Sequence, residues 1–249
     1  MISAHTGLPE LPNFVELLAK KLGEGSDFGK YLLIWQSVIF SLLGVIIISV
    51  LAYLGARKRE LVPGRLQNAM ELIFGGLDDF ICGILGKEGR RLVPFIGTLF
   101  IYILFLNLFG LVPFMKSSTS SLSTTLGLAL CVFVYVHYTA LRQLGFLGYI
   151  KHLMGNPNKA LALTVVLPVF LFFMHVLSEL IHPISLSLRL RSNIFADDML
   201  LAAVSGFGLR ALPLLIFCML LVIVSAVVQA VVFSLLSTVY FALFLKHEE

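Results

Sequence analysis

Charged side chains are scarce in this chain: Asp, Glu, Lys and Arg make up only 13% of it, against 59% hydrophobic residues. A soluble domain of 249 residues needs far more polar surface, and a mean hydropathy of +0.98 excludes that class. The net charge of +4 is small and lies mainly in the loops, so it gives little support to nucleic-acid binding. Several windows of about 20 residues are almost free of charge, which indicates a membrane protein with several spans.

Cysteine is also rare, and the three cysteines show no metal-ligand spacing. They are Cys82, Cys131 and Cys218. An odd number cannot pair completely, so we interpret them as small apolar residues and expect neither a metal nor a cofactor. The first 30 residues lack a basic region followed by an early apolar core, and so resemble neither a secretory signal nor a transit peptide. A bacterial inner membrane is the simplest location.

The apolar runs predict helices rather than strands. Strands of a membrane barrel alternate in polarity over about 10 residues, whereas these runs are longer and continuously apolar. Lipid also requires that every backbone polar group be satisfied within the protein. We therefore predict an all-α polytopic membrane protein, with one membrane domain over residues 1–249, five long membrane-embedded helices and one interfacial or cytoplasmic helix.

The first three spans are predicted at residues 31–55, 92–114 and 119–141. The first ends in the basic stop "ARKRE", which the positive-inside rule assigns to the cytoplasm, so residues 1–30 would be extracytoplasmic. The stretch "AMELIFGGLDDFICGILG" lies between two basic clusters and contains three carboxylates, which favours an interfacial helix. The short polar turn "MKSSTSS" predicts that the second and third spans are antiparallel.

Two longer helical patterns follow, at residues 160–204 and 209–246, separated by "SGFG". The first contains Pro168 and Pro183 but no convincing loop. At about 1.5 Å per residue the two helices would be roughly 65 and 55 Å long. Because the hydrocarbon core of a bilayer is about 30 Å thick, we predict a long tilted hairpin whose carboxyl end lies in the cytoplasm.

A polar seam runs along the first helix of this predicted hairpin. With 100° per residue, five polar residues fall within about 40° of Arg189. They are His175, Ser178, His182, Ser185 and Asn193. Glu179 and Asp197 fall near 80°, at the edge of the seam, and Asp198 falls near 180°. Arginine keeps its charge on burial because its pKa exceeds about 12, so the seam offers a permanent cation beside groups that can exchange protons.

Structural explanations of these residues stay open. Arg189 could be an ion-pair partner of Glu179 or Asp197, although charges at this depth are usually functional. Arg191 lies about 160° from Arg189 and is better explained by snorkelling or by pairing with a carboxylate such as Asp198.

Isolated polar residues in membrane helices are often structural too. A lone histidine such as His175 or His182 is commonly a satisfied core residue, and only its place on the seam favours contact with water. Gln229 stands alone in an apolar background on the last helix and could make a hydrogen bond between helices. Asn107 in the second span is interpreted in the same way.

Three function classes fit this architecture: a secondary ion-coupled transporter, an ion-pathway subunit of a larger machine, and a membrane scaffold. Transporters usually show paired repeats with broken helices, which we do not find in this sequence. A scaffold has no need of the seam. The second class therefore agrees best with the residues.

Four segments resemble the a subunit of F-type ATP synthases, the stator protein beside the rotating ring of c subunits. They are "LVPGRLQNAMELI", "FLNLFGLVPF", "PISLSLRLRSNIFADDML" and "VVQAVVFSLLSTVYF", and the similarity covers roughly residues 55–245. The resemblance implies a non-catalytic subunit with two proton half-channels, which couples proton translocation to ATP synthesis or hydrolysis. The implied partners are the c ring, the b subunits of the peripheral stalk, the rest of the complex and membrane lipid.

The resemblance also assigns residues. Arg189 matches the family's essential arginine, which faces the ring carboxylate in mid-membrane. Asn193 and Asp198 match polar positions four and nine residues later, and Gln229 matches the glutamine of the last helix. The other candidates for lining a half-channel are His175, Glu179, His182 and Asp197. Asp198 is expected to face a different surface from Arg189, as two separate aqueous paths would require.

Three departures from the family pattern affect the expected channel lining. The pair Arg191-Ser192 stands where an aromatic residue and a glycine are frequent. His175 stands where a carboxylate is common and Glu179 where a histidine is common, so the two residue types are exchanged relative to the family pattern. Val222 occupies a position where some relatives carry an ionisable group.

Overall fold

The regular structure of the protein is helical. The computed structural model describes residues 27–57, 64–112, 115, 117–153 and 163–245, and most of the predicted extracytoplasmic segment lies outside them. The α-helices are α2 (Asp27–Arg57), α3 (Arg65–Leu85), α4 (Val93–Phe109), α5 (Leu122–Leu153), α6 (Leu163–Ser205) and α7 (Leu212–Leu245). Three 3₁₀ helices join them: η1 (Gly86–Arg91), η2 (Ser118–Ser120) and η3 (Gly208–Ala211). Within the described residues no strand occurs, which confirms the predicted all-α class.

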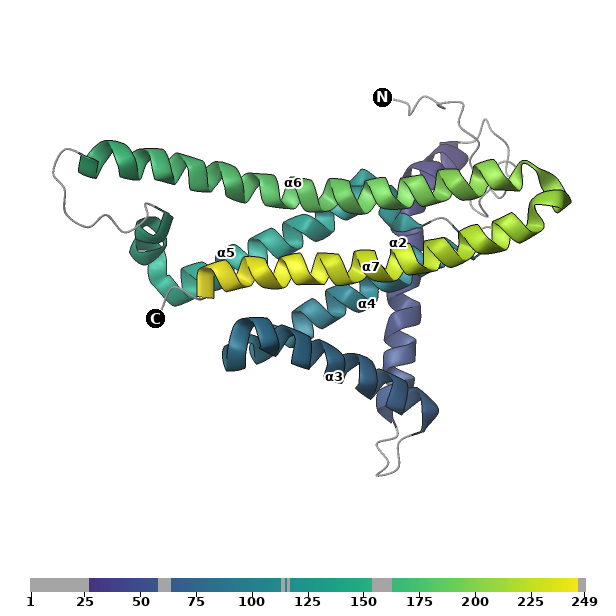
Figure 1. Cartoon of the computed structure of the whole chain (residues 1–249), viewed down its shortest axis with the longest axis horizontal. Coiled ribbons are helices and arrows are strands. Elements are labelled where there is room, and N and C mark those ends of the chain that lie inside the picture. The colour runs from purple at the N-terminus through teal and green to yellow at the C-terminus, as the bar shows by residue number, and fades with distance from the viewer. Residues whose placement is uncertain (1–26, 58–63, 113–114, 116, 154–162, 246–249) are drawn as a thin grey trace.

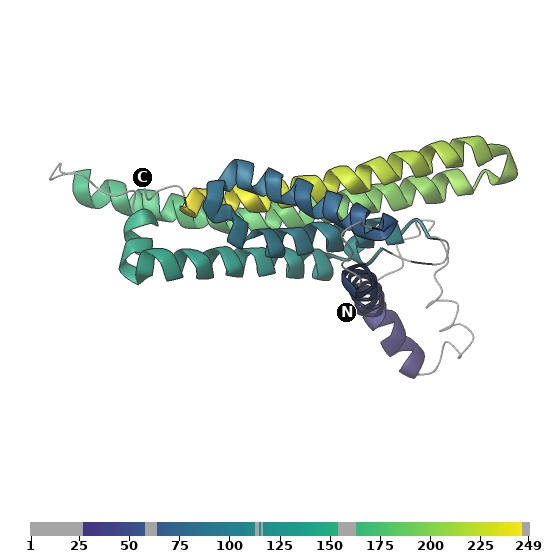
Figure 2. The same ribbon diagram turned by 90° about the horizontal axis from the view of Figure 1, so that it is seen from below.

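The two longest helices, α6 and α7, form an antiparallel hairpin (Figure 1). They contain 43 and 34 residues, which corresponds to about 65 and 51 Å. α2 runs across the direction of this hairpin, whereas α5 follows it on one side (Figure 1, Figure 2). Neither long helix fits upright into a hydrocarbon core of about 30 Å, so a bilayer can contain the hairpin only if the hairpin is strongly tilted, which is the predicted arrangement.

The hairpin turn and the interior of α6 follow from local sequence. Gly208 has a φ of +66°, a left-handed conformation that glycine adopts without the steric cost of a Cβ atom. Pro183 lies inside α6 but does not end it. Since proline has no N–H, the backbone carbonyl of Glu179, four residues earlier, loses its helical donor there.

Four described helical segments are long and apolar enough to cross a membrane. They are Ile34–Leu54, Leu122–Gln143, Val169–Ser205 and Leu212–Phe244. The predicted second span is shorter than expected, because α4 ends at Phe109 and Gly110 caps it. The helix of the predicted third span is longer, since α5 continues past residue 141 to Leu153 with a break at Gly145, whose φ is +68°. The basic segment expected to be a loop is thus helical as far as Leu153.

Helix α3 is not among these candidate spans, in agreement with an interfacial position. Its Asp78 carboxylate accepts a hydrogen bond from Arg90 at 3.2 Å. This bond, more than the charge of Arg90, holds the pKa of Asp78 below its ordinary value despite partial desolvation. Asp78 also accepts a hydrogen bond from the Cys82 thiol at 3.5 Å.

The core lies between α4, α5, α6 and α7, with α3 packed against it. Its fully buried side chains include Ile96 and Ile103 of α4, Val136 of α5, Leu190 of α6 and Phe233 of α7. By contrast, many large apolar side chains on α2, α6 and α7 are exposed. These faces need lipid or a partner subunit to cover them.

Helix α2 joins the bundle through a close contact with α4. The hydroxyl groups of Ser41 and Tyr102 share a hydrogen bond. Nearby, Gly44 packs so tightly that a Cβ atom would lie 2.9 Å from Cδ2 of Leu106. Small residues allow such close approach of membrane helices, which explains why glycine stands at this position.

Candidate functional site

Arg189 lies near the middle of the described part of α6, beside a cavity of about 260 Å³. The cavity is bordered by α5, α6 and α7, and its polar lining includes His182, Ser185, Ser237 and Tyr240. Arg189 is an exposed residue, and none of the ion pairs found among the described residues includes it. The guanidinium group is therefore available to an external partner.

On the carboxyl-terminal side of Arg189, four polar residues join α6 to α7; we call them the amide cluster. They are Asn193, Asp197, Ser225 and Gln229. The side-chain amide of Asn193 donates to Oε1 of Gln229 at 2.7 Å. The hydroxyl of Ser225 donates to the Asp197 carboxylate at 2.9 Å. The structure thus brings together three candidates that the sequence had placed on two helices.

A cavity of about 10 Å³, room for one water molecule, lies beside the amide cluster. Asn107 of α4 lines it and is 5% exposed. Its carbonyl oxygen accepts from the Thr119 hydroxyl at 2.9 Å, while its amide nitrogen has no partner among the residues that the structure describes. The hydrogen bond shown for Asn107 thus joins α4 to η2.

Asp198 borders this same small cavity, together with Asn193 and Asp197. Arg189 borders the larger cavity and is absent from this lining, so Asp198 and Arg189 face different cavities. The assignment of these cavities to two separate aqueous paths stays a prediction.

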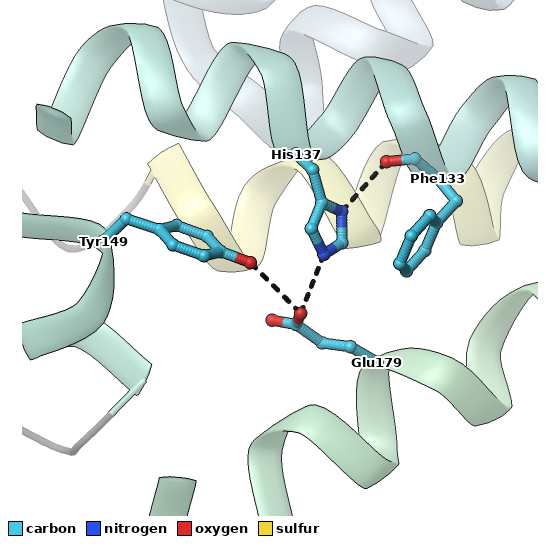
Figure 3. Close-up of polar contacts among 4 residues, drawn as sticks. All are labelled: Phe133, His137, Tyr149 and Glu179. Atoms are coloured by element: carbon cyan, nitrogen blue, oxygen red, sulfur yellow. Dashed lines mark hydrogen bonds and ion pairs between the residues drawn. The ribbon is translucent and has the colours of Figure 1, made fainter. Parts of the chain in front are cut away.

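On the amino-terminal side of Arg189, Glu179 belongs to a second group, which we call the histidine cluster: His137, Tyr149 and Glu179 (Figure 3). Nε2 of His137 lies 2.8 Å from Oε2 of Glu179, and the Tyr149 hydroxyl donates to the same oxygen at 3.3 Å. Glu179 of α6 thus contacts α5, and the partner of its carboxylate is His137, not Arg189.

The other two candidates lie apart from this contact. His175 is exposed, and its Nδ1 donates to the carbonyl of Leu171 in its own helix at 2.9 Å. The His182 ring packs on the Tyr240 ring in a tilted arrangement, with centroids 5.0 Å apart, at the edge of the larger cavity. His175 and Glu179 therefore have different surroundings, and the histidine that contacts Glu179 is His137.

His137 and Tyr149 were not among the residues predicted from the sequence. Their contacts with Glu179 join residues 42 and 30 positions apart, which no periodicity on a single helix can show. The available signal was the presence of a histidine inside the apolar run "CVFVYVHYTAL". No group of three His, Cys, Asp or Glu side chains that could hold a metal ion is found in the described ranges.

Comparison with known proteins identifies the family. Residues 38–242 match the family described as ATP synthase A chain. The chain belongs to this family. It is 38% identical over 250 residues to ATP synthase subunit a of Protochlamydia amoebophila, covering 97% of this chain and 91% of the relative. It is 34% identical to ATP synthase subunit a of Solidesulfovibrio magneticus, covering 97% and 98% of the two chains.

A third relative, ATP synthase subunit a of Moorella thermoacetica, is 35% identical and covers 85% of this chain and 91% of its own. The resemblance drawn from the four sequence segments is thus confirmed. As a member of the ATP synthase A chain family, the protein is a membrane component of ATP synthesis and proton transport.

Proposed function

We propose that this chain is the stator a subunit of an F-type ATP synthase and provides two proton half-channels to a rotating ring of c subunits. The observation that carries the proposal is the order of polar groups along α6. Glu179 stands ten residues before Arg189, about 15 Å along the axis, and Asn193 and Asp197 stand about 6 and 12 Å beyond it. The histidine cluster contacts α5, whereas the amide cluster contacts α7.

Arg189 lies between the two clusters and separates them electrostatically. A ring carboxylate that arrives opposite its guanidinium group is favoured in the ionised form, so it releases its proton to one half-channel. After leaving the cation it takes up a proton from the other half-channel before it meets lipid. A membrane potential of about 100 mV contributes about 2.3 kcal/mol per proton to this cycle. Because arginine does not readily give up its own proton, Arg189 blocks a direct leak.

The proposed orientation places the amino terminus outside and the carboxyl terminus in the cytoplasm of a bacterium. The basic residues after α2 support it, since positive charge favours the cytoplasmic side. The amide cluster would then belong to the outer half-channel and the histidine cluster to the cytoplasmic one. The c ring, the b subunits of the peripheral stalk and lipid are the partners proposed to cover the exposed apolar faces.

The test compares Arg189→Ala with Arg191→Ala in the assembled complex, using inverted membrane vesicles. Arg191 is an exposed arginine two residues away and provides a matched control. We expect Arg189→Ala to abolish ATP-driven proton pumping and coupled synthesis, while Arg191→Ala keeps most of both. Normal coupling in Arg189→Ala would contradict the proposed function. Solute uptake by the purified chain alone in liposomes would favour a secondary ion-coupled transporter instead.

A cross-linking experiment tests the ring as partner. A cysteine at the exposed Ser178 or Ser185 of the seam, in a chain with Cys131→Ser, is expected to cross-link to a small membrane subunit that carries a carboxylate. Cross-links only to larger subunits would place the seam against a different partner.

A further inference from the structure

The histidine cluster has a geometry that fixes how many protons it holds. Nδ1 of His137 lies 2.9 Å from the backbone carbonyl of Phe133 (Figure 3). A carbonyl oxygen can only accept, so Nδ1 carries a hydrogen and the neutral ring presents a lone pair at Nε2. Nε2 faces Oε2 of Glu179 at 2.8 Å, and two lone pairs do not make such a contact.

One proton must therefore lie between His137 and Glu179. If it sits on Nε2 the two groups are an ion pair, and if it sits on Oε2 they are a neutral hydrogen-bonded pair. Oε2 also accepts from Tyr149 at 3.3 Å, and this bond is compatible with both positions of the proton. The pair has zero net charge in either form, which suits a site with low access to water.

The burial of the pair is partial, as proton exchange requires. The side chains of His137 and Glu179 are 19% and 13% exposed. The His137 ring packs on Phe133 and Phe244, with centroids 4.0 and 5.9 Å away. These rings lower the local dielectric but leave the carboxylate within reach of water.

Three further titratable groups surround the pair. Tyr149 of α5 lies beyond the candidate span Leu122–Gln143, and burial, together with the charge of Glu179, raises the pKa of its hydroxyl, so it stays a donor at physiological pH. From α7, the Tyr240 ring lies 6.2 Å from the His137 ring. From α6, the His182 ring packs on the far neighbour Tyr240, tilted by 36° to it, and so lies one residue removed from the pair.

Tyr240 also connects the histidine cluster to Arg189. It is 7% exposed and lines the 260 Å³ cavity that Arg189 borders, a space large enough for several water molecules. Within the described part of the chain the buried Tyr240 hydroxyl has no hydrogen-bond partner. The rings of Tyr240 and Phe133 line the cavity and also pack on the His137 ring, so one layer of side chains separates the cavity from the histidine cluster.

We propose that His137 and Glu179 hold one exchangeable proton between them and act together as the proton relay between the cavity beside Arg189 and the solution on the side where α7 ends. The relay rests on the proposed function. In the exit direction, the shared proton passes to water on the solution side and leaves neutral His137 with ionised Glu179. Water in the cavity then supplies the next proton and restores zero net charge. In the reverse direction the same two steps run backwards, one proton in for each proton out.

The relay is tested in the assembled complex with four variants. His137→Gln and Glu179→Gln each remove one half of the pair, and we expect ATP-driven pumping, and passive proton conductance after removal of the ATPase head, to fall at least about tenfold. The double exchange His137→Glu with Glu179→His restores a pair of the same chemistry and should recover rates to within about threefold of the parent. Tyr149→Phe removes one donor to Glu179 and should shift the pH profile of the conductance.

Tyr138→Phe is the matched control for Tyr149→Phe, because Tyr138 is an exposed residue of the same helix, next to His137. It should conduct like the parent. Parental rates and an unshifted pH profile in His137→Gln and Glu179→Gln would overturn the relay while leaving the half-channels intact, since Arg189→Ala tests those separately. If either single variant fails to assemble, the pH profile of Tyr149→Phe decides: an unshifted profile also overturns the relay.

Discussion

The hydrogen bond between Asn193 and Gln229 gives the most direct test of the α6–α7 contact. Gln229 is 4% exposed, and the bond of 2.7 Å lies at the short end of the normal range. Hydrogen bonds between membrane helices average about 0.6 kcal/mol and reach about 1.7 kcal/mol, and this bond should fall in the upper half of that range. Gln229→Leu alone costs more, about 1–3 kcal/mol, because it leaves the Asn193 amide without its acceptor.

A double-mutant cycle separates the bond from these other effects. Asn193→Leu, Gln229→Leu and the double variant are unfolded with sodium dodecyl sulfate in mixed micelles and followed by circular dichroism. We expect a coupling free energy of about 1–1.7 kcal/mol. Ser234→Ala is the control on α7, because the Ser234 hydroxyl donates to the carbonyl of Ala230 in its own helix. It should be additive with Asn193→Leu, within about 0.5 kcal/mol. A coupling free energy below about 0.5 kcal/mol between Asn193 and Gln229 would refute the hydrogen bond.

Three further predictions concern packing and the interfacial helix. Gly44→Val should clash with Leu106 and cost about 1–3 kcal/mol, seen as less assembled complex, whereas Gly127→Val, where a Cβ atom meets nothing within 4 Å, should assemble normally. Phe233→Ala, at a fully buried position, should cost about 3–5 kcal/mol in the same unfolding titration, and a loss below about 1 kcal/mol would contradict a packed core. Burial, and next the hydrogen bond to Asp78, raises the pKa of the Cys82 thiol. Asp78→Asn in a chain with Cys131→Ser should therefore lower that pKa and speed alkylation of Cys82 at pH 8, and an unchanged rate would count against the contact.

Acidification should act on the Asp78–Arg90 contact in a defined direction. The pKa of Asp78 is lower in the folded protein than its ordinary value, so the contact stabilises the fold above the ordinary pKa. That contribution is lost as the pH falls through the lowered pKa. Arg90→Gln should remove this part of the pH dependence, which an unfolding titration between neutral and acidic pH would detect.

The sequence predicted the hairpin well because its signal is strong. Two very long apolar runs on either side of "SGFG" leave few other arrangements, and α6 and α7 begin and end within a few residues of the expected positions. The ends of α4 and α5 were less predictable, because Gly110 stops one helix early and Gly145 only breaks the other. Hydropathy over a window does not distinguish these two effects of glycine.

The site was predictable only along α6. A rotation of 100° per residue groups Arg189, His182 and Asn193 on one helix, but it contains no information about which other helix faces them. The packing of α4, α5 and α7 against α6 decides the remaining contacts. It pairs Glu179 with His137, and it places Asn193 and Asp198 at one cavity.

The length of the hairpin has a geometric consequence for the path of an ion. An upright helix would stack Glu179 and Asn193 one above the other, as in a single straight pore. In α6 the two residues lie about 21 Å apart along the axis, and a helix too long to stand upright in the bilayer turns much of that separation sideways. In the proposed arrangement, an ion that enters beside one residue is therefore carried laterally before it leaves beside the other. The lateral distance between the two residues is the distance that the proposed moving partner has to travel.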